Sequence, residues 1–129
     1  MTGQSHDGSE PPRRTRDVVE SHLELRQRGD LERDLDLNYS PEVVLLSAEG
    51  VQHGHDGVRR LADVLQTYVD AGRYTYEQVL VDGEVAMLMW SAADQRVLIH
   101  DGADSYVVRD GLIQAQTIHY SVARRDRRS

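Results

Sequence analysis

Two Asp-Gly dipeptides, Asp82-Gly83 and Asp110-Gly111, each separate two runs of apolar and β-branched residues in the second half of the chain. Asp-Gly between such runs is typical of β-hairpins, because both residues adopt the positive φ that a tight type I′ turn requires. The runs read RYTYEQVLV and EVAMLMWSA, then RVLIHDGADSYVV and LIQAQTIHYSV. We therefore predict four antiparallel strands after Gly72.

Helical patterns occupy the first half of the chain. Apolar residues at helical spacing predict an amphipathic helix over 15–28 that ends near Gly29 and carries His22 on its apolar face. A short second helix fits residues 31–38, with Asp30 as its N-cap.

One strand and one further helix follow. Pro41 disfavours a helix and introduces the extended run EVVLLS, residues 42–47, which predicts a strand. The stretch GVQHGHDG is rich in turn-forming residues, so we predict a connection there. A third amphipathic helix is expected from an N-cap at Asp56 to an end at Gly72.

Helices early in the chain and a long strand meander late indicate an α+β fold, with the helices covering one face of a curved sheet. The space between such a sheet and its helices is a natural place for a ligand. A length of 129 residues suits one domain. We expect a flexible leader over 1–14, the domain over 15–122 and a basic flexible tail over 123–129.

Composition excludes several classes of function. The chain has no Cys, which rules out disulfides and thiolate metal sites, and its net charge of -7 disfavours nucleic-acid binding. No signal-type or membrane-spanning apolar run is present, so we expect a cytoplasmic protein without a membrane partner. His53 and His55 are two residues apart without a nearby third ligand, a weak metal signal. We expect no metal and no cofactor.

Two segments resemble a known group of proteins. They are RGDLERDLDLNYSPEVVLLSAEGVQHGHDGVRRL and VVRDGLIQAQTIHYSV, and over residues 16–122 the chain resembles the SnoaL-like branch of the nuclear transport factor 2-like superfamily. The resemblance implies a cone-shaped fold with three N-terminal helices, an enclosed pocket and a homodimer formed through the outer face of the sheet. The superfamily includes ketosteroid isomerases, polyketide cyclases, dehydratases, epoxide hydrolases, binding proteins and scaffolds, so it leaves the function open.

The resemblance implies roles for particular positions. Asp104 matches the neutral acid of the ketosteroid isomerase pattern, His22 matches a helical Tyr that assists it, and Ser47 matches the general base. A serine cannot replace a carboxylate in proton transfer at neutral pH, which argues against that reaction in its familiar form. Gly102 stands where the epoxide hydrolase pattern has Arg, which argues against that chemistry too.

Asp104 and His22 are the two candidate catalytic residues. Asp104 inside a strand, directed at a desolvated cavity, would have its pKa raised until it is neutral near pH 7, whereas a solvated position beside Gly102 would leave it inert. His22 could act with Asp104 as an acid and base pair, or be a satisfied histidine of the core.

Alternation along the strands divides the other polar candidates. His119 is expected on the outer face at a dimer contact, while His100 shares a face with Asp104 unless Gly102 carries a bulge. The resemblance favours inward positions in the last strand for Gln116, Ile118 and Tyr120.

Two methionines and two tyrosines complete the candidate pocket. Met87 and Met89 share one strand face and could line an apolar cavity, because thioether side chains adapt to irregular ligands. The alternative is an ordinary core position. Tyr39 and Tyr68 are expected to close the mouth of the cavity.

Two functions follow from these observations. The first is a cofactor-independent acid/base enzyme, of isomerase, cyclase or dehydratase type, that acts on a small apolar carbonyl-bearing molecule through Asp104 and His22. The second is a non-catalytic ligand-binding or dimerisation module of the same fold, which Ser47 in place of a carboxylate favours.

Overall fold

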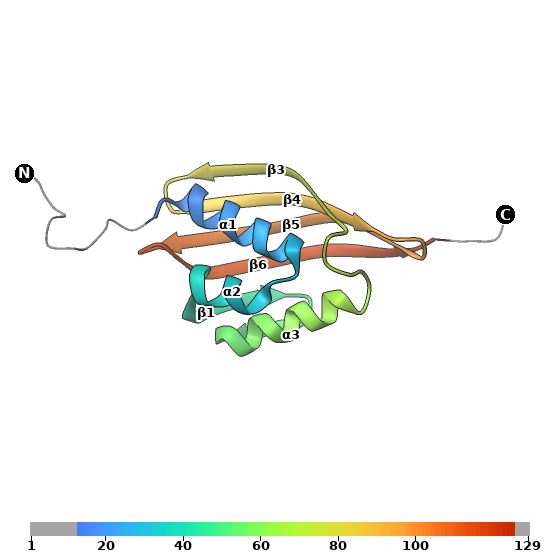
Figure 1. The fold of residues 1–129 in the computed structure, drawn as a ribbon, viewed down its shortest axis with the longest axis horizontal. Coiled ribbons are helices and arrows are strands. Elements are labelled where there is room, and N and C mark those ends of the chain that lie inside the picture. Colours follow the sequence, from blue (N-terminus) through green and yellow to red (C-terminus); the bar gives the residue numbers. More distant parts are fainter. Residues whose placement is uncertain (1–12, 126–129) are drawn as a thin grey trace, which may run out of the picture.

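A computed structural model describes residues 13–125 of the chain. Within these residues the elements follow in the order α1 (Thr15–Arg28), α2 (Leu31–Asn38), β1 (Tyr39–Ser47), β2 (Gly50–His53), α3 (Gly54–Gln66), β3 (Tyr74–Asp82), β4 (Val85–Ala93), β5 (Val97–Arg109) and β6 (Leu112–Arg124). The three helices lie over one face of the sheet, which confirms the predicted α+β class (Figure 1). None of the described helices is long and apolar enough to cross a membrane.

The strands form one sheet in the order β2-β1-β6-β5-β4-β3. The four strands from β3 to β6 are antiparallel, as predicted, and β2 pairs antiparallel with β1. Strand β1 runs parallel to β6, which joins the first half of the chain to the end of the last hairpin. Residues from both halves of the sequence therefore face the same helices.

Bulges give the sheet its curvature. Strand β3 carries an extra residue between Tyr76 and Gln78, and β5 carries one near Asp101, which shifts the register of β5 with both β4 and β6. An extra residue in one strand bends it and increases its twist, so neighbouring bulges curve the sheet around the helices. The alternative of a bulge beside Gly102 is thus the one that the structure shows.

The boundaries of the first two helices agree with the prediction. Gly29 ends α1 with a φ of 79°, and its N–H donates to the carbonyls of Arg26 and Leu25. Asp30 caps α2 by accepting a hydrogen bond from the N–H of Arg33. Both caps satisfy helix-terminal backbone groups, so local sequence alone determines these boundaries.

The two hairpins use different turns. Asp110 and Gly111 are the central residues of the second turn and have φ of 56° and 74°, as a type I′ turn requires. In the first hairpin Asp82 pairs with Val85, so the central residues are Gly83 and Glu84, and only Gly83 has a positive φ. The expected type I′ turn is therefore wrong at the first Asp-Gly.

The region around α3 differs from the prediction. Residues Gly50–His53 form a strand, β2, where only a connection was expected. The N-cap of α3 is His53, and Asp56 lies in the first turn rather than at the cap. The helix ends at Gln66, well before the predicted end at Gly72.

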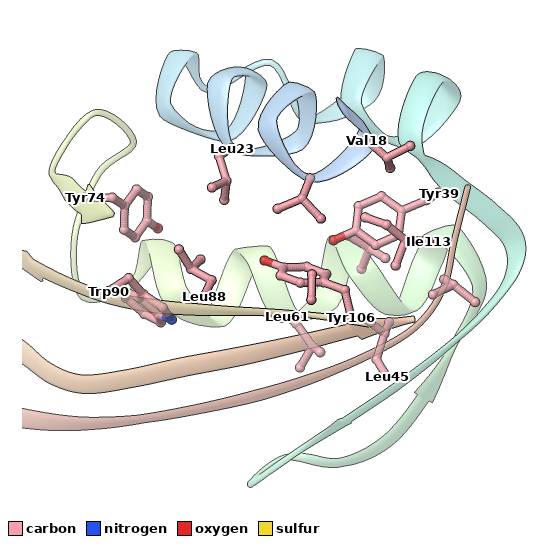
Figure 2. Packing of buried hydrophobic residues seen from close by; sticks show 14 of the residues in the cluster. Val18, Leu23, Tyr39, Leu45, Leu61, Tyr74, Leu88, Trp90, Tyr106 and Ile113 are labelled. Atoms are coloured by element: carbon pink, nitrogen blue, oxygen red, sulfur yellow. The ribbon is translucent and has the colours of Figure 1, made fainter. Parts of the chain in front are cut away.

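The core lies between the helices and the inner face of the sheet (Figure 2). Its fully buried large side chains include Tyr106, Leu35, Leu45, Ile99 and Ile113. Because the chain has no Phe, tyrosine and one tryptophan supply the aromatic bulk of this core, and each brings a polar atom that needs a partner.

The ends of the domain extend slightly beyond the expected boundaries. Arg13 was assigned to the leader, yet it donates to the side chain of Asn38 and to the carbonyl of Gly111. Strand β6 continues to Arg124, past the expected boundary at 122. The rest of the leader and tail, residues 1–12 and 126–129, lies outside the described residues.

Candidate functional site

A cavity of about 280 Å³ lies between α3, the end of α1 and the inner face of β1, β5 and β6. Apolar side chains of α3, among them Val58, Leu61 and Leu65, form one wall. The volume is close to the lower end, roughly 300 Å³, of the range of small-molecule sites. The cavity therefore suits a compact ligand.

Eight of the eleven candidate site residues lie in the wall of this cavity. They come from α1, β1, β5, β6 and the turn after α3, and are His22, Tyr39, Ser47, Tyr68, Asp104, Gln116, Ile118 and Tyr120. The fold thus brings together residues up to 98 positions apart in the sequence, since His22 and Tyr120 share one wall.

Asp104 is buried at the inner face of β5, with 8% of its surface exposed. Its Oδ1 accepts a hydrogen bond from Nε1 of Trp90 at 3.0 Å. Its Oδ2 accepts from Nε2 of Gln116 at 3.1 Å and from the hydroxyl of Tyr106 at 3.3 Å. An ionised carboxylate offers about four acceptor positions, so one position on Oδ1 stays open after these three bonds.

The surroundings of Asp104 decide its charge. Burial raises its pKa from the ordinary 3.8 to about 6, while the hydrogen bond from Trp90 and the charge of a protonated His22 act in the opposite direction. The shift has the expected direction, and the three donors, which stabilise the anion, limit its size. At neutral pH Asp104 is mostly an anion, suited to accept a proton.

Gly102 makes the contact between Trp90 and Asp104 possible. Trp90 lies opposite Gly102 in the sheet, and a Cβ atom at position 102 would stand 2.5 Å from the Trp90 ring. The missing side chain lets the indole lie across β5 and reach Asp104, the next inward residue. The Gly-x-Asp spacing is therefore a packing requirement of the site.

Gln116 connects Asp104 to the first strand. Its Nε2 donates to Asp104, and its Oε1 accepts a hydrogen bond from the hydroxyl of Tyr39. Burial raises the pKa of Tyr39 well above its ordinary value, so its hydroxyl stays protonated and donates. Gln116 therefore lies on the inner face, as predicted, and it links the Tyr39 hydroxyl to the Asp104 carboxylate.

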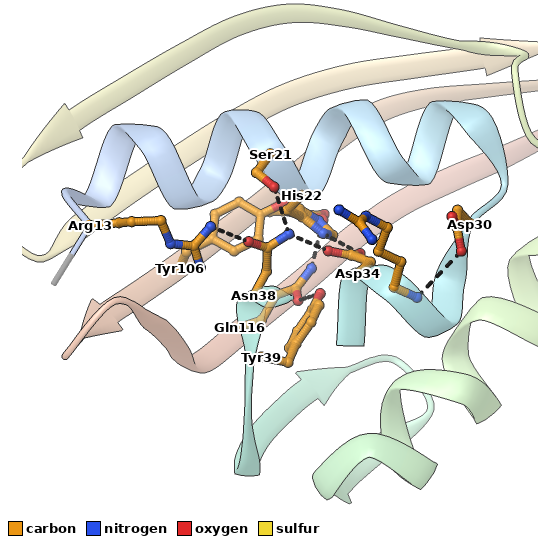
Figure 3. A network of polar contacts seen from close by, with 11 residues as sticks. Arg13, Ser21, His22, Asp30, Asp34, Asn38, Tyr39, Tyr106 and Gln116 are labelled. Atoms are coloured by element: carbon orange, nitrogen blue, oxygen red, sulfur yellow. Dashed lines mark hydrogen bonds and ion pairs between the residues drawn. The ribbon is translucent and has the colours of Figure 1, made fainter. Parts of the chain in front are cut away.

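His22 is buried and has a carboxylate partner (Figure 3). Its Nδ1 lies 2.7 Å from Oδ2 of Asp34, a residue of α2 with no exposed surface. The edges of the Tyr39 and Tyr106 rings pack against the imidazole, with centroids 5.4 and 5.5 Å away. A carboxylate on Nδ1 holds the proton there and leaves Nε2 as the reactive nitrogen.

Sequence reasoning missed Asp34, which organises the polar cluster between α1 and α2. Its Oδ1 accepts from Nδ2 of Asn38 at 2.8 Å, and the same amide donates to Oγ of Ser21. Arg13 donates to Oδ1 of Asn38 (Figure 3). The available signal was that Asp34 and Asn38, four residues apart, fall on the buried side of α2 with Leu35.

Aromatic side chains form another wall of the cavity. The Trp90 and Tyr120 rings lie 5.6 Å apart, and Tyr68 meets Tyr120 edge to face at 6.4 Å. Burial raises the pKa of Tyr120 to about 12, so its hydroxyl is protonated at neutral pH. Ser47, half-buried at the end of β1, accepts a hydrogen bond from the N–H of Glu49.

Met87 and Met89 do not line the cavity. They are 38% and 40% exposed, and they alternate with the buried Ala86, Leu88 and Trp90. The expectation of a cavity position is wrong because β4 is apolar on both faces, so its alternation does not indicate which face is inward. Both methionines lie on the outer face of the sheet.

His100 is also outside the cavity. It pairs with Ser121 in the sheet, half of its side chain is exposed, and its Nδ1 lies 3.0 Å from Asp101. The bulge beside Gly102 breaks the alternation that would have placed it with Asp104. The pocket position expected for His100 is therefore wrong.

His119 lies at the boundary between the two faces. It pairs with Ala103, its side chain is exposed, and it adjoins the cavity between Ile118 and Tyr120. Because strand residues alternate, we place its side chain on the outer face and its main chain at the cavity wall.

His53 is the N-cap of α3 without a side-chain cap bond, and His55 lies in the first turn of the helix. His55 contacts the carbonyl of Tyr39 through Nε2 at 3.1 Å. Among residues 13–125 no three His, Cys, Asp or Glu side chains gather as a metal ion would require. The polar groups around Asp104 and His22 are hydrogen-bond donors and acceptors, an arrangement that is able to transfer protons.

Comparisons with known proteins show the family of this fold. The family model of the SnoaL-like domain matches residues 19–116, and the chain belongs to this family. The curated proteins yield no match.

Solved structures share the fold at low sequence identity. An NTF-2 like protein of unknown function from Burkholderia xenovorans LB400 has a TM-score of 0.67 and 13% identity, over 83% of this chain and 82% of its own. A polyketide cyclase candidate from Sinorhizobium meliloti has a TM-score of 0.63 and 18% identity, over 80% and 94%. TerC, co-crystallized with polyporic acid, has a TM-score of 0.65 and 14% identity, over 83% and 91%.

Proposed function

We propose that this protein is a cofactor-independent acid/base enzyme that acts on a small, apolar, carbonyl-bearing molecule, by isomerisation, cyclisation or dehydration. The observation that carries the proposal is the buried Asp104 carboxylate in the wall of the cavity, which has a pKa of about 6 and one acceptor position that its three hydrogen bonds leave unused. A carboxylate poised near neutral pH accepts and returns a proton efficiently. The cyclase candidate among the structural neighbours supports the same class of chemistry.

Asp104 would remove a proton from the carbon next to the substrate carbonyl. Desolvation raises the basicity of its carboxylate, and the three donors hold it in one orientation. Once protonated, it can return the proton to a different carbon or to a leaving oxygen. Each of these outcomes is a proton transfer that needs no metal or cofactor.

His22 would act on the substrate oxygen. With its Nδ1 held by Asp34, a protonated imidazole donates through Nε2 to the oxygen on which negative charge develops, and a neutral one accepts a proton there. Asp34 is then a positioning residue, since it contacts His22 and does not line the cavity.

The test uses 2-tetralone, a two-ring ketone, as the probe. Trp90 is the single tryptophan of the chain and lines the cavity, so quenching of its fluorescence measures binding. Exchange of the α-hydrogens for deuterium in D₂O, followed by NMR, measures proton transfer. We expect the wild type to accelerate exchange and Asp104→Asn to lower the rate by roughly 100-fold or more, as loss of a general base does.

Control variants sharpen the result. Ser105→Ala, on the outward side of β5, should leave both binding and exchange unchanged. Equal exchange rates in the wild type and Asp104→Asn would contradict the catalytic role. A second function, non-catalytic ligand binding, is favoured by Ser47 in place of a carboxylate, and binding without any exchange would support it.

A further inference from the structure

Arg26 is the one feature of the cavity wall that proton transfer leaves unexplained. It lies in the last turn of α1, one helical turn after His22, and is half-buried. Among residues 13–125 no side chain or carbonyl accepts a hydrogen bond from its guanidinium or forms an ion pair with it. None of its nitrogens is among the fully buried polar atoms, so its five N–H donors are available to an anionic or carbonyl group in the cavity.

The other arginines support this reading. Within the described part of the chain, the half-buried Arg13 and Arg59 both have acceptors, the latter in ion pairs with Glu32 and Asp56. The arginines whose side chains have no such partner are otherwise exposed to solvent, which satisfies them: Arg14, Arg33, Arg60, Arg73, Arg96 and Arg124.

A second, smaller hollow places Arg26 next to the reactive groups. It has a volume of about 50 Å³ and shares Arg26, His22 and Asp104 with the main cavity, to which it adds Tyr74 and Tyr76. A water molecule occupies roughly 30 Å³ of liquid, so the hollow has room for a group with two oxygen atoms. Arg26 therefore stands where the two hollows meet.

The tyrosines of the small hollow are suited to the same ligand group. Burial raises the pKa of Tyr74 and of Tyr76, and the positive charge of Arg26 partly offsets this, which is consistent with their closeness to the guanidinium. Their rings stack at 6.2 Å, and both hydroxyls stay protonated at neutral pH. Protonated phenols and a guanidinium are all hydrogen-bond donors, and a carboxylate accepts from such a set.

We propose that the ligand of this cavity carries a carboxylate, which Arg26 binds through its guanidinium at the small hollow while the carbonyl end lies against Asp104 and His22. The inference rests on the proposed function and adds the substrate class, an apolar keto acid. The two acids of the cavity wall are compatible with it, because Asp104 is held by its own three donors and Glu49 lies at the exposed rim.

The test compares two probes of the same shape, 2-naphthoate and 2-naphthamide, by isothermal titration calorimetry at pH 7.5. Hydrogen bonds between a guanidinium and a charged acceptor are stronger than those to a neutral one, so we expect the wild type to bind the carboxylate at least 10-fold more tightly than the amide. Arg26→Gln should abolish this preference and change the amide affinity less than two-fold. Arg28→Gln, two residues along the same helix and paired with Glu24, is the matched control and should keep the preference.

The possible results distinguish a failure of the role of Arg26 from a failure of the proposed function. Equal affinities in the wild type, or a preference for the carboxylate that persists in Arg26→Gln, overturns the role of Arg26 while the exchange assay with 2-tetralone still stands. If neither naphthalene probe nor 2-tetralone binds at millimolar concentration, the cavity is not a small-molecule site, and the inference and the proposed function fall together.

Discussion

Burying the carboxyl group of Asp104 has a cost that depends on pH. Its pKa rises from 3.8 to about 6 on folding, so between these values the folded chain holds a proton that the unfolded chain has lost. The free energy of unfolding therefore falls as the pH rises through this window. A buried carboxylate kept at some expense to stability is typical of functional sites.

This linkage gives a prediction at the scale of one residue. Relative to Asp104→Asn, the wild type should lose about 2 kcal/mol of unfolding free energy between pH 4.5 and pH 7, since each pKa unit corresponds to about 1.4 kcal/mol. Urea unfolding, followed by Trp90 fluorescence at several pH values, measures this difference. Asp36→Asn, at an exposed position of α2, should show no such trend, and a flat difference for Asp104→Asn would contradict the raised pKa.

At the scale of elements, the bulged centre of the sheet positions the site. The bulge on β5 changes the side-chain phase between His100 and Asp104, and Gly102 within it leaves room for the indole of Trp90. In a regular strand His100 would lie on the same face as Asp104. A side chain at position 102 would then block the contact between Trp90 and the Asp104 carboxylate. The irregular part of the strand is thus the part on which the cavity depends.

Gly102→Ala tests this dependence. The added Cβ would meet both the ring and the carbonyl of Trp90 at 2.5 Å, so either the indole or the strand must move. Overpacking of this kind costs about 1–3 kcal/mol of unfolding free energy. We also expect a changed near-UV circular dichroism signal from Trp90. Ser105→Ala, on the same strand, should change stability by less than about 0.5 kcal/mol, and a similarly silent Gly102→Ala would show that the close approach is unimportant.

At the scale of the whole molecule, the outer face of the sheet is unusually apolar for a surface. Leu80 and Met87 are direct neighbours there, and Val85 and Met89 continue the patch along β4, with exposed fractions between 38% and 55%. The homodimer implied by the resemblance remains a prediction, and this patch, opposite the helices, is the surface on which we expect it.

Met87→Glu tests the expected dimer. A charge in the middle of an apolar interface carries a desolvation cost of several kcal/mol, so we expect a dimeric wild type and a monomeric variant at micromolar concentration. Analytical ultracentrifugation measures both masses. Leu37→Glu, at an exposed position of α2 on the helical side, is the matched control and should remain dimeric. A monomeric wild type would contradict the prediction.

Local sequence signals by themselves determined most of the elements in this protein. Gly29, Asp30 and the Asp110-Gly111 turn act on their own backbone neighbours, so a few residues were enough to predict α1, α2 and the last hairpin. The strand β2 was missed because pairing with β1, rather than a local pattern, stabilises it.

Only the tertiary structure decided the composition of the site. Asp34 meets His22 across two helices, and Trp90 reaches Asp104 across two strands, contacts that leave no mark in a local pattern. The sheet face on which Met87 lies also depends on which face of β4 the helices cover. Periodicity shows that a strand has two faces, but burial against other elements determines which face is inside, and that is a property of the folded chain as a whole.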